Sequence, residues 1–208
     1  MKTIITIGRT FGSGGHEIGE KLAEEFGIKC YDKELLSRAA KESGLCEEVI
    51  RNHDERPTNS FLYNLVMDTY SFGYSSLSYM DMPVSHKAFM AQYDTIKNIA
   101  SDGPCVIVGR CADYALQGRD DVLNVFIYAK IEDCVKRVME RFPDIKSREE
   151  AKQLKYKKDK QRKSYYDYYS SKRWGHMESY DLSVDSSVLG IDGTVKFLKQ
   201  FVEDYEKA

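Results

Sequence analysis

Residues 8–17 hold the densest group of glycines in the chain, directly after the short apolar run 4–7. Glycines let backbone N–H groups close around an anion, and the N-terminus of a following helix adds partial positive charge. Apolar residues recur at helical spacing over 18–26. The pattern predicts a phosphate-binding loop between a buried strand and a helix. The predicted phosphate-binding residues are Gly8, Arg9, Gly12, Ser13, Gly14, Gly15, His16 and Glu17.

The loop departs from the phosphate-loop pattern G-x-x-x-x-G-K-[ST] in both registers that its glycines allow. With Gly14 as the second glycine, Arg9 takes the slot of the first glycine and Gly15 the slot of the lysine. With Gly15 as the second glycine, the lysine and hydroxyl slots fall on His16 and Glu17. The usual cation is missing in either register, so positive charge has to come from Arg9 or from arginines elsewhere. The loop favours phosphate binding over fast phosphoryl transfer, and a glycine turn that binds nothing is the alternative.

Two further strand ends carry residues suited to phosphate chemistry. Arg110 follows the buried run 105–108 and Gly109, and a guanidinium is well suited to bidentate phosphate binding. Asp32 ends the short strand 28–31 and can orient an acceptor hydroxyl or a hydrated Mg²⁺ ion. The alternatives are a salt bridge for Arg110, to Asp32 or Asp113, and a helix N-cap for Asp32.

Strands and helices alternate along the rest of the chain. Apolar runs predict strands at 4–7, 28–31, 105–108, 123–128 and 180–184, with helices between them. This alternation predicts an α/β fold with a five-stranded parallel sheet and helices on both faces. Ligands of such sheets bind at the carboxyl ends of the strands, where residues 8, 32, 109 and 110 fall.

Three segments together resemble the cytidylate kinase-like branch of the P-loop nucleoside monophosphate kinases. They are Gly12-Ser13-Gly14, Asp32 with Arg38 six residues later, and Val108-Gly109-Arg110 with Asp113. In that family the glycine loop holds the donor phosphates, two later segments hold the acceptor nucleotide, and an arginine-bearing lid follows strand four. The resemblance implies a P-loop kinase fold with a helical insertion and a lid. It also implies ATP and Mg²⁺ as cofactors, the Mg²⁺ arriving with the nucleotide and not in a protein cluster.

The resemblance also assigns roles to residues. Arg110, Arg162 and Arg173 become the catalytic cations, and Asp32, Arg38, Arg110 and Asp113 the acceptor-binding residues. Asp113 stands two residues beyond the aspartate of the family's GRD segment, because Cys111 and Ala112 intervene.

The resemblance predicts a single kinase-like domain over 1–208. Within this domain we expect an inserted helical subdomain over 45–84 and the lid over 145–178. The insertion is rich in tyrosine and methionine, residue types favoured at interfaces, which suggests a homodimer contact or a substrate cover. The tyrosines at 165–169 are expected to pack against the insertion or a second subunit.

Composition narrows the remaining choices. A formal net charge of −2 gives no general affinity for nucleic acid. Five scattered cysteines, the absence of a leader and the absence of a long apolar run predict a cytoplasmic protein without a membrane segment. The predicted function is ATP-dependent transfer of a γ-phosphoryl group to a nucleoside monophosphate or other small acceptor. Alternatives are a non-catalytic nucleotide or phosphometabolite sensor on the kinase fold, and an NAD-binding Rossmann oxidoreductase.

Overall fold

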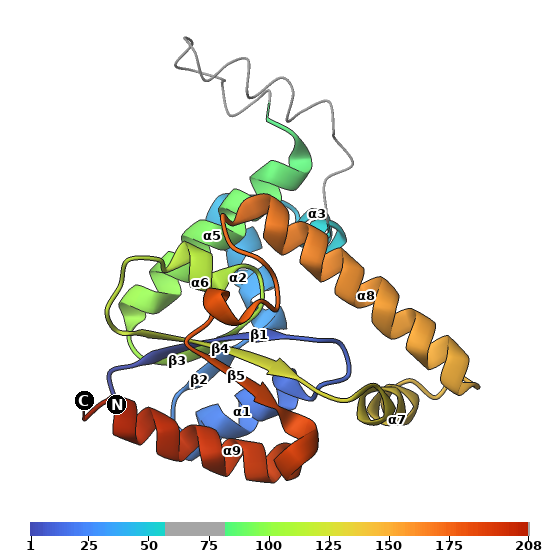
Figure 1. Cartoon of the computed structure of the whole chain (residues 1–208). Helices are drawn as coiled ribbons and strands as arrows, with labels where there is room; N and C mark the ends of the chain where they lie inside the picture. Colours follow the sequence, from blue (N-terminus) through green and yellow to red (C-terminus); the bar gives the residue numbers. More distant parts are fainter. Residues whose placement is uncertain (57–81, 208) are drawn as a thin grey trace.

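The computed structural model describes residues 1–56 and 82–207 of the 208-residue chain, and its centre is a five-stranded parallel sheet (Figure 1). The strands lie in the order β2-β3-β1-β4-β5, and every neighbouring pair is parallel. Their bounds are Ile4–Arg9 (β1), Lys29–Tyr31 (β2), Cys105–Val108 (β3), Val122–Tyr128 (β4) and Leu182–Asp185 (β5). The predicted five-stranded parallel sheet is confirmed.

Helices cover both faces of this sheet. They are α1 (Gly15–Phe26), α2 (Lys33–Ser43), α3 (Glu47–His53), α5 (Val84–Asp102), α6 (Ala112–Ala115), α7 (Ile131–Arg141), α8 (Arg148–Tyr169) and α9 (Ser186–Tyr205). Figure 1 shows α1 and α9 on one face and α2, α5 and α6 on the other. The predicted α/β layering with both faces covered is therefore correct.

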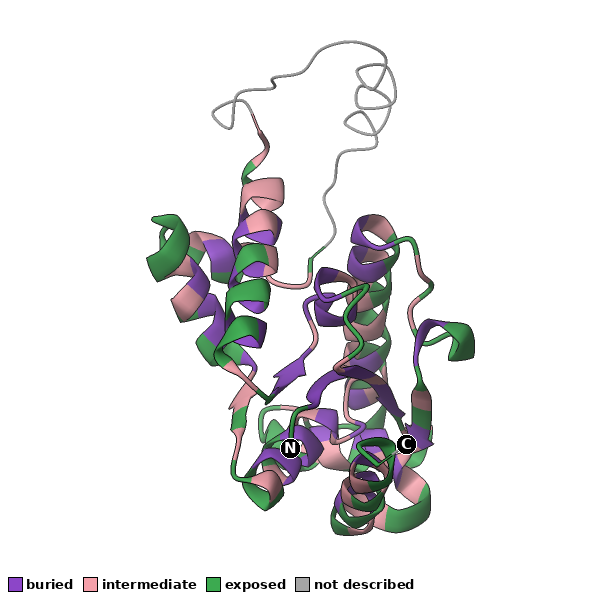
Figure 2. Cartoon of the chain, turned by 90° about the vertical axis from the view of Figure 1, so that its left-hand side faces the viewer, coloured by how far each residue is buried: buried purple, intermediate pink, exposed green. Residues whose placement is uncertain are grey.

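Alternate residues of β1 pack into two separate hydrophobic cores, one on each face of the sheet. Ile5 and Ile7 pack with apolar residues of α1 and α9. Ile4 packs on the opposite face with residues of α2 and α5. Period-two alternation of the side chains produces this division, since successive residues of a strand point to opposite faces. Figure 2 shows the same pattern, with buried ribbon concentrated in the sheet and on the inner sides of the helices.

The C-terminal elements differ from the sequence-based boundaries. The last strand was predicted at 180–184, but it spans Leu182–Asp185, and α9 begins directly after it at Ser186. Asp185 caps that helix by accepting a hydrogen bond from the Ser187 amide at 2.9 Å. A kink at Gly190 (φ +67°) divides α9, and it hides the first turn from a search for continuous helical periodicity.

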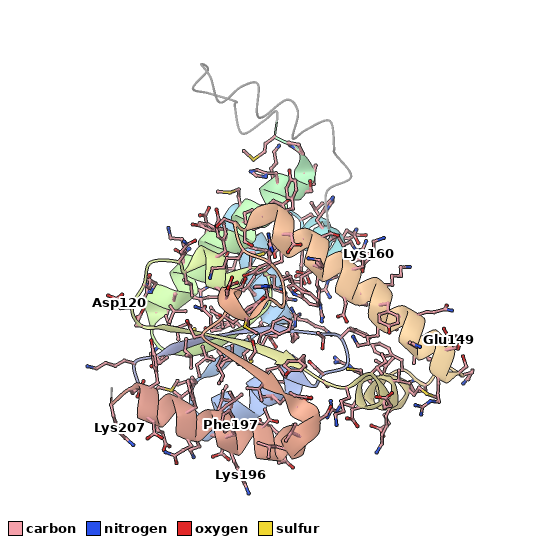
Figure 3. The ribbon with its side chains drawn as sticks, viewed as in Figure 1. Asp120, Glu149, Lys160, Lys196, Phe197 and Lys207 are labelled. Atoms are coloured by element: carbon pink, nitrogen blue, oxygen red, sulfur yellow. The ribbon has the colours of Figure 1, made fainter. Side chains whose placement is uncertain are left out.

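Helix α8 lies within the predicted lid over 145–178, and several of its tyrosines pack against neighbouring elements of the chain. The ring centroids of Tyr169 and Phe89 of α5 are 3.9 Å apart with nearly parallel planes, and Tyr165 meets Phe89 edge-on. Among the described residues these rings pack on α5 and near Tyr180. Residues 57–81 of the insertion lie outside the described residues, so packing of the tyrosines on the insertion or on a second subunit stays a prediction. Outward residues of α8 such as Lys160 are exposed, and Figure 3 shows Lys160 at the outer margin of the molecule.

Two predictions concern regions that the structure describes only in part. Of the predicted insertion over 45–84, the structure describes residues 45–56, which include α3, and residues 82–84. Residues 57–81 lie outside the described residues, together with the proposed homodimer contact. The predicted lid over 145–178 includes α8 and the segment after it. Across residues 1–56 and 82–207, no helix combines the length and the apolar character needed to cross a membrane.

Candidate phosphate-binding site at the carboxyl edge of the sheet

The register of the sheet brings three predicted positions to one edge. Ile7 of β1 lies beside Val108 of β3, and Tyr31 of β2 lies beside Ile107. The residues that follow each strand therefore meet: Arg9 at the end of β1, Gly109 and Arg110 after β3, and Asp32 after β2. A cavity of about 1020 Å³ opens at this edge, between the β1–α1 loop and α8. Its volume is sufficient for a nucleotide-sized ligand.

The β1–α1 loop has the backbone form of an anion cradle. Gly12 and Gly14 both have positive φ, at +82° and +81°, and α1 begins at Gly15. The hydrogen bonds of the described residues leave the amides of Gly12, Gly14 and His16 without a protein acceptor. These N–H groups stand at the amino end of a helix, where partial positive charge favours an anion.

Two side chains hold the loop from neighbouring elements. Asp159 of α8 accepts a hydrogen bond from the Phe11 amide at 2.7 Å. Arg137 of α7 donates to the carbonyl oxygen of Gly12 at 3.3 Å. The fully buried Ser13 donates from Oγ to the carbonyl of Thr10 at 2.8 Å, so its hydroxyl is committed to the loop itself. Ser13 thus acts as part of the loop's framework.

Arg110 is 4% exposed and is surrounded by carboxylates. Its Nη1 pairs with Asp32 Oδ1 and donates to the Val108 carbonyl at 2.7 Å. Its Nε and Nη2 each lie 3.0 Å from an oxygen of Asp54. The predicted salt bridge to Asp32 is present, and Asp54 adds a second partner that the sequence did not indicate.

Asp32 also contacts His16 of the loop, whose Nδ1 lies 3.0 Å from Asp32 Oδ2. Burial alone would raise the pKa of Asp32, but the His16 hydrogen bond and the charge of Arg110 hold that pKa well below its usual value. Asp32 is therefore ionised and a weak base. Its side chain makes no cap bond to α2, so the N-cap alternative is not what orders it.

Glu55 sits at the centre of the arginines. Its Oε1 pairs with Arg9 Nη1, and its Oε2 lies 3.1 Å from both Arg9 Nη2 and Arg162 Nε. Its Oε1 also accepts from the Arg110 amide at 3.3 Å. Burial alone would raise the pKa of Glu55, but the three guanidinium charges hold it well below the usual value.

The structure does not bring every predicted residue into the cavity. Those that line it are Arg9, Gly12, Gly14, Gly15, His16, Glu17, Asp32, Arg110 and Arg162. Gly8, Ser13, Arg38, Asp113 and Arg173 are outside its lining.

Arg38, predicted as an acceptor-binding residue, and Arg173, predicted as a catalytic cation, do not line the cavity. Arg38 points along the outside of α2 and pairs with Glu42 at 2.6 Å and Asp102 at 2.9 Å. Arg173 is exposed, and its amide donates to Ser179 Oγ at 3.1 Å. Helical phase directs Arg38 away from the sheet edge, which the six-residue spacing from Asp32 alone does not show.

Asp113 is buried next to the aromatic cluster around α8. It accepts a hydrogen bond from the Tyr166 hydroxyl at 2.6 Å, and Lys172 Nζ lies 3.5 Å away. Burial raises the pKa of this carboxyl. Because Asp113 lies on α6, these contacts hold α8 and the segment after it against α6.

Sequence reasoning missed Asp54, Glu55 and Arg137. The two carboxylates could have been expected from the arginines, because arginines buried at a sheet edge need buried acidic partners. Asp32 alone cannot balance Arg9, Arg110 and Arg162. Further acids therefore had to come from a segment outside the sheet, and Asp54 and Glu55 directly follow α3.

The groups present suit an oxyanion better than a protein-held metal ion. Among the described residues, no three His, Cys, Asp or Glu side chains gather in a way that could hold a metal ion. Both oxygens of Asp32 are already engaged, by Arg110 and His16. Loop amides and guanidinium groups that converge on one cavity are donors for phosphate or carboxylate oxygens.

Comparison with known proteins agrees with this description. The model of the cytidylate kinase-like family matches residues 4–188. A crystal structure of an uncharacterized protein from Eubacterium ventriosum ATCC 27560 is 27% identical with a TM-score of 0.72, covering 97% of this chain and 99% of that one. A comparison with curated proteins gave no match.

Two kinases share the fold at low identity. Shikimate kinase from Bacteroides thetaiotaomicron is 12% identical with a TM-score of 0.53, covering 98% of this chain and 99% of that one. A gluconokinase from Sinorhizobium meliloti 1021 is 13% identical with a TM-score of 0.51, covering 98% and 95%. The chain therefore has the fold of small-molecule P-loop kinases.

Proposed function

This chain belongs to the cytidylate kinase-like family, and we propose that it is an ATP-dependent phosphotransferase acting on a nucleoside monophosphate or another small acceptor. One observation supports the proposal above all others: loop amides without a protein acceptor among the described residues and three arginines line the same cavity. The arginines are Arg9 at the end of β1, Arg110 after β3 and Arg162 of α8. Phosphoryl transfer depends mainly on positioning and on stabilising charge, and these are the groups that supply both.

In this proposal the donor phosphates lie at the start of α1, on the amides of Gly12, Gly14 and His16, which have no protein acceptor among the described residues. Arg162 approaches from α8 and neutralises charge on the transferring group. Burial, and next the nearby charge of Arg9, lower the pKa of Arg162. The Glu55 carboxylate lies between the two guanidinium groups and offsets part of this repulsion. In the proposal a phosphate, with more negative charge, takes the place of Glu55 between them.

The acceptor lies on the side of Asp32 and Arg110. An ionised Asp32 with a low pKa suits a role in orienting an acceptor hydroxyl and is poorly suited to removing its proton. Arg110 holds Asp32 and Asp54 in place and shapes this side of the cavity. Mg²⁺ is proposed to enter with the nucleotide phosphates and to neutralise part of their charge.

A non-catalytic nucleotide-binding protein is the second candidate, and the loop favours it at one point. Neither Gly15 nor His16 supplies the lysine or the hydroxyl that the usual loop provides. An NAD-binding Rossmann protein receives no support, because β3 lies between β1 and β2, whereas the Rossmann order places strand two next to strand one.

Two measurements on the full chain test the proposal. A thermal melt with Mg²⁺ and ATP detects binding through linkage even without turnover, and coupled detection of ADP with a panel of nucleoside monophosphates and small hydroxyl acceptors detects transfer. Arg162→Ala should reduce the ATP-induced shift, whereas Lys160→Ala, on the exposed side of the same helix, should not. A shift without ADP release supports the non-catalytic candidate, and no ATP-dependent shift contradicts both.

A further inference from the structure

The structure selects one of the two loop registers. Gly14 has the left-handed conformation and caps α1, whereas Gly15 is already the first helical residue. Gly14 is therefore the second glycine of the pattern G-x-x-x-x-G-K-[ST]. Arg9 then stands in the slot of the first glycine, Gly15 in the slot of the lysine and His16 in the slot of the hydroxyl residue.

Side chains at positions 9 and 15 exclude one another. A Cβ atom added to Gly15 would lie 2.6 Å from the Cβ of Arg9 and 3.1 Å from its Cγ. Carbon atoms do not approach so closely without displacement of the backbone, since favourable separations are about 3.5–4.0 Å. The usual loop combines glycine at the first slot with lysine at the seventh, and this chain has the reverse combination in the same space.

The Arg9 side chain extends from this crowded point into the cavity. A Cβ on Gly109, which has φ +80°, would lie 2.0 Å from Arg9 Nη1. Two glycines thus make room for one arginine, Gly15 beside its stem and Gly109 beside its guanidinium. The arginine is 7% exposed and reaches the wall of the cavity.

The guanidinium of Arg9 already holds an oxyanion. Both of its terminal nitrogens pair with the carboxylate of Glu55, and Arg162 Nε reaches the same carboxylate at 3.1 Å. Two guanidinium groups thus surround one carboxylate. Phosphate oxygens can bind to the same nitrogens, because a guanidinium binds carboxylate and phosphate with the same bidentate geometry. The position is therefore a built anion site.

We infer that Arg9 is the phosphate-binding cation of this loop and replaces the missing lysine through an exchange of side chains between positions 9 and 15. The inference rests on the proposed function and names the donor side of it: the ligand of Arg9 is the terminal phosphate of a nucleoside triphosphate. Gly15 is a glycine because Arg9 fills its space.

Isothermal titration of the full-length chain with ATP in the presence of Mg²⁺ tests this inference. The key pair is E55Q against R9G/E55Q, because Glu55 is neutralised in both and only the arginine differs. We expect R9G/E55Q to bind ATP at least about tenfold more weakly than E55Q, as for loss of one charge-assisted contact. Arg119→Ala is the matched control, because Arg119 also pairs with a carboxylate, that of Asp121, but outside the cavity.

A rebuilt loop gives the second, positive test. The triple substitution R9G/G15K/H16T restores the full G-x-x-x-x-G-K-[ST] pattern and should bind ATP within about threefold of wild type, a difference of about 0.7 kcal/mol. R9G alone should remain weak. Thermal melts without ligand confirm that each variant is folded.

The outcomes separate this inference from the proposed function. Equal ATP affinity of E55Q and R9G/E55Q overturns the inference alone if wild type binds ATP. So does a triple variant that binds no better than R9G. A wild-type chain that binds no ATP overturns the proposed function and, with it, the role of Arg9, whether or not the triple variant binds.

Discussion

The carboxylate of Glu55 faces both terminal nitrogens of Arg9, with 3.1 Å between Oε2 and Nη2. Glu55 reaches this position with a positive φ of +48°, which non-glycine residues rarely adopt. Contacts with the arginines, and not local backbone preference, therefore keep it there. A carboxylate of the chain itself thus occupies the place proposed for the terminal phosphate of the ligand.

Glu55→Gln should accordingly have opposite effects on stability and on binding. Loss of a buried charged partner lowers the free energy of unfolding by about 1–3 kcal/mol. Inorganic phosphate and ATP should bind about tenfold more tightly, because the competing carboxylate charge is gone. Denaturant titration and calorimetry measure the two effects. Glu47→Gln, which removes an exposed partner of Arg51, is the control, and weaker phosphate binding by Glu55→Gln would contradict the competition.

Stability should fall in acid because of Asp32 and Glu55. Both carboxyls have folded-state pKa values well below their usual values of about 4, so their ionisation stabilises the fold above that pH. As the pH drops below about 4, the unfolded chain takes up these protons more readily, and the stabilisation is lost progressively. The free energy of unfolding should therefore begin to decline at about pH 5 and should keep falling below about pH 3, because the folded-state pKa values lie well below the usual ones.

Substitutions of single carboxyls test which residues cause the loss of stability in acid. Asp32→Asn and Glu55→Gln should each flatten the decline, whereas Glu24→Gln, an exposed carboxyl of α1, should leave its slope unchanged. Denaturant unfolding followed by circular dichroism at several pH values gives the slopes. Equal slopes for wild type and Asp32→Asn would remove Asp32 from the explanation.

Gly12→Ala should damage the loop through a steric clash as well as through its backbone conformation. A Cβ at Gly12 would lie 2.7 Å from the carbonyl oxygen of Cys134, in addition to the strain of φ +82°. Gly118→Ala is a matched control, because Gly118 has φ +85° but no atom near the added Cβ. We expect about 1–2 kcal/mol from the conformation in both variants and a further loss, with weaker ATP binding, only at Gly12. Melting temperatures and ATP titrations separate the two effects.

Tyr166→Phe should loosen α8. The Tyr166 hydroxyl donates to the buried Asp113 carboxylate at 2.6 Å, and its removal leaves a buried acceptor with one partner fewer. The expected loss is about 1–3 kcal/mol of stability. Tyr156→Phe, at an exposed ring of the same helix, should cost little. Similar melting temperatures for the two variants would show that the Tyr166–Asp113 bond does not secure α8.

Much of the fold was predictable from local patterns. Residues 4–9 form a strand because their apolar side chains are buried on both faces of a parallel sheet, and such strands appear as continuous apolar runs. Helix α8 was predictable from its length and from Ser147 with Glu150, which form a capping box. The first turn of α9 was not predictable in the same way, since Gly190 interrupts the helical spacing of its apolar residues.

The candidate site was predictable only where the sheet positions it. Arg9, Asp32 and Arg110 follow strands, so parallel register brings them together. Glu55 and Asp54 follow a short helix, and no spacing rule places that segment over the sheet edge. Arg38 pairs with Glu42 and Asp102 and does not line the cavity. Residues on one helix can point toward the cavity or away from it, and the choice depends on tertiary packing.

A crystal structure of the full chain with Mg²⁺ and a non-hydrolysable ATP analogue would show directly whether the glycine loop and Arg9 bind the phosphates. We expect the phosphate chain within about 3 Å of the amides of Gly12, Gly14 and His16, with Arg9 and Arg162 turned from Glu55 to the terminal phosphate. A phosphate chain bound away from residues 8–17 would rule out both the proposed donor site and the role of Arg9.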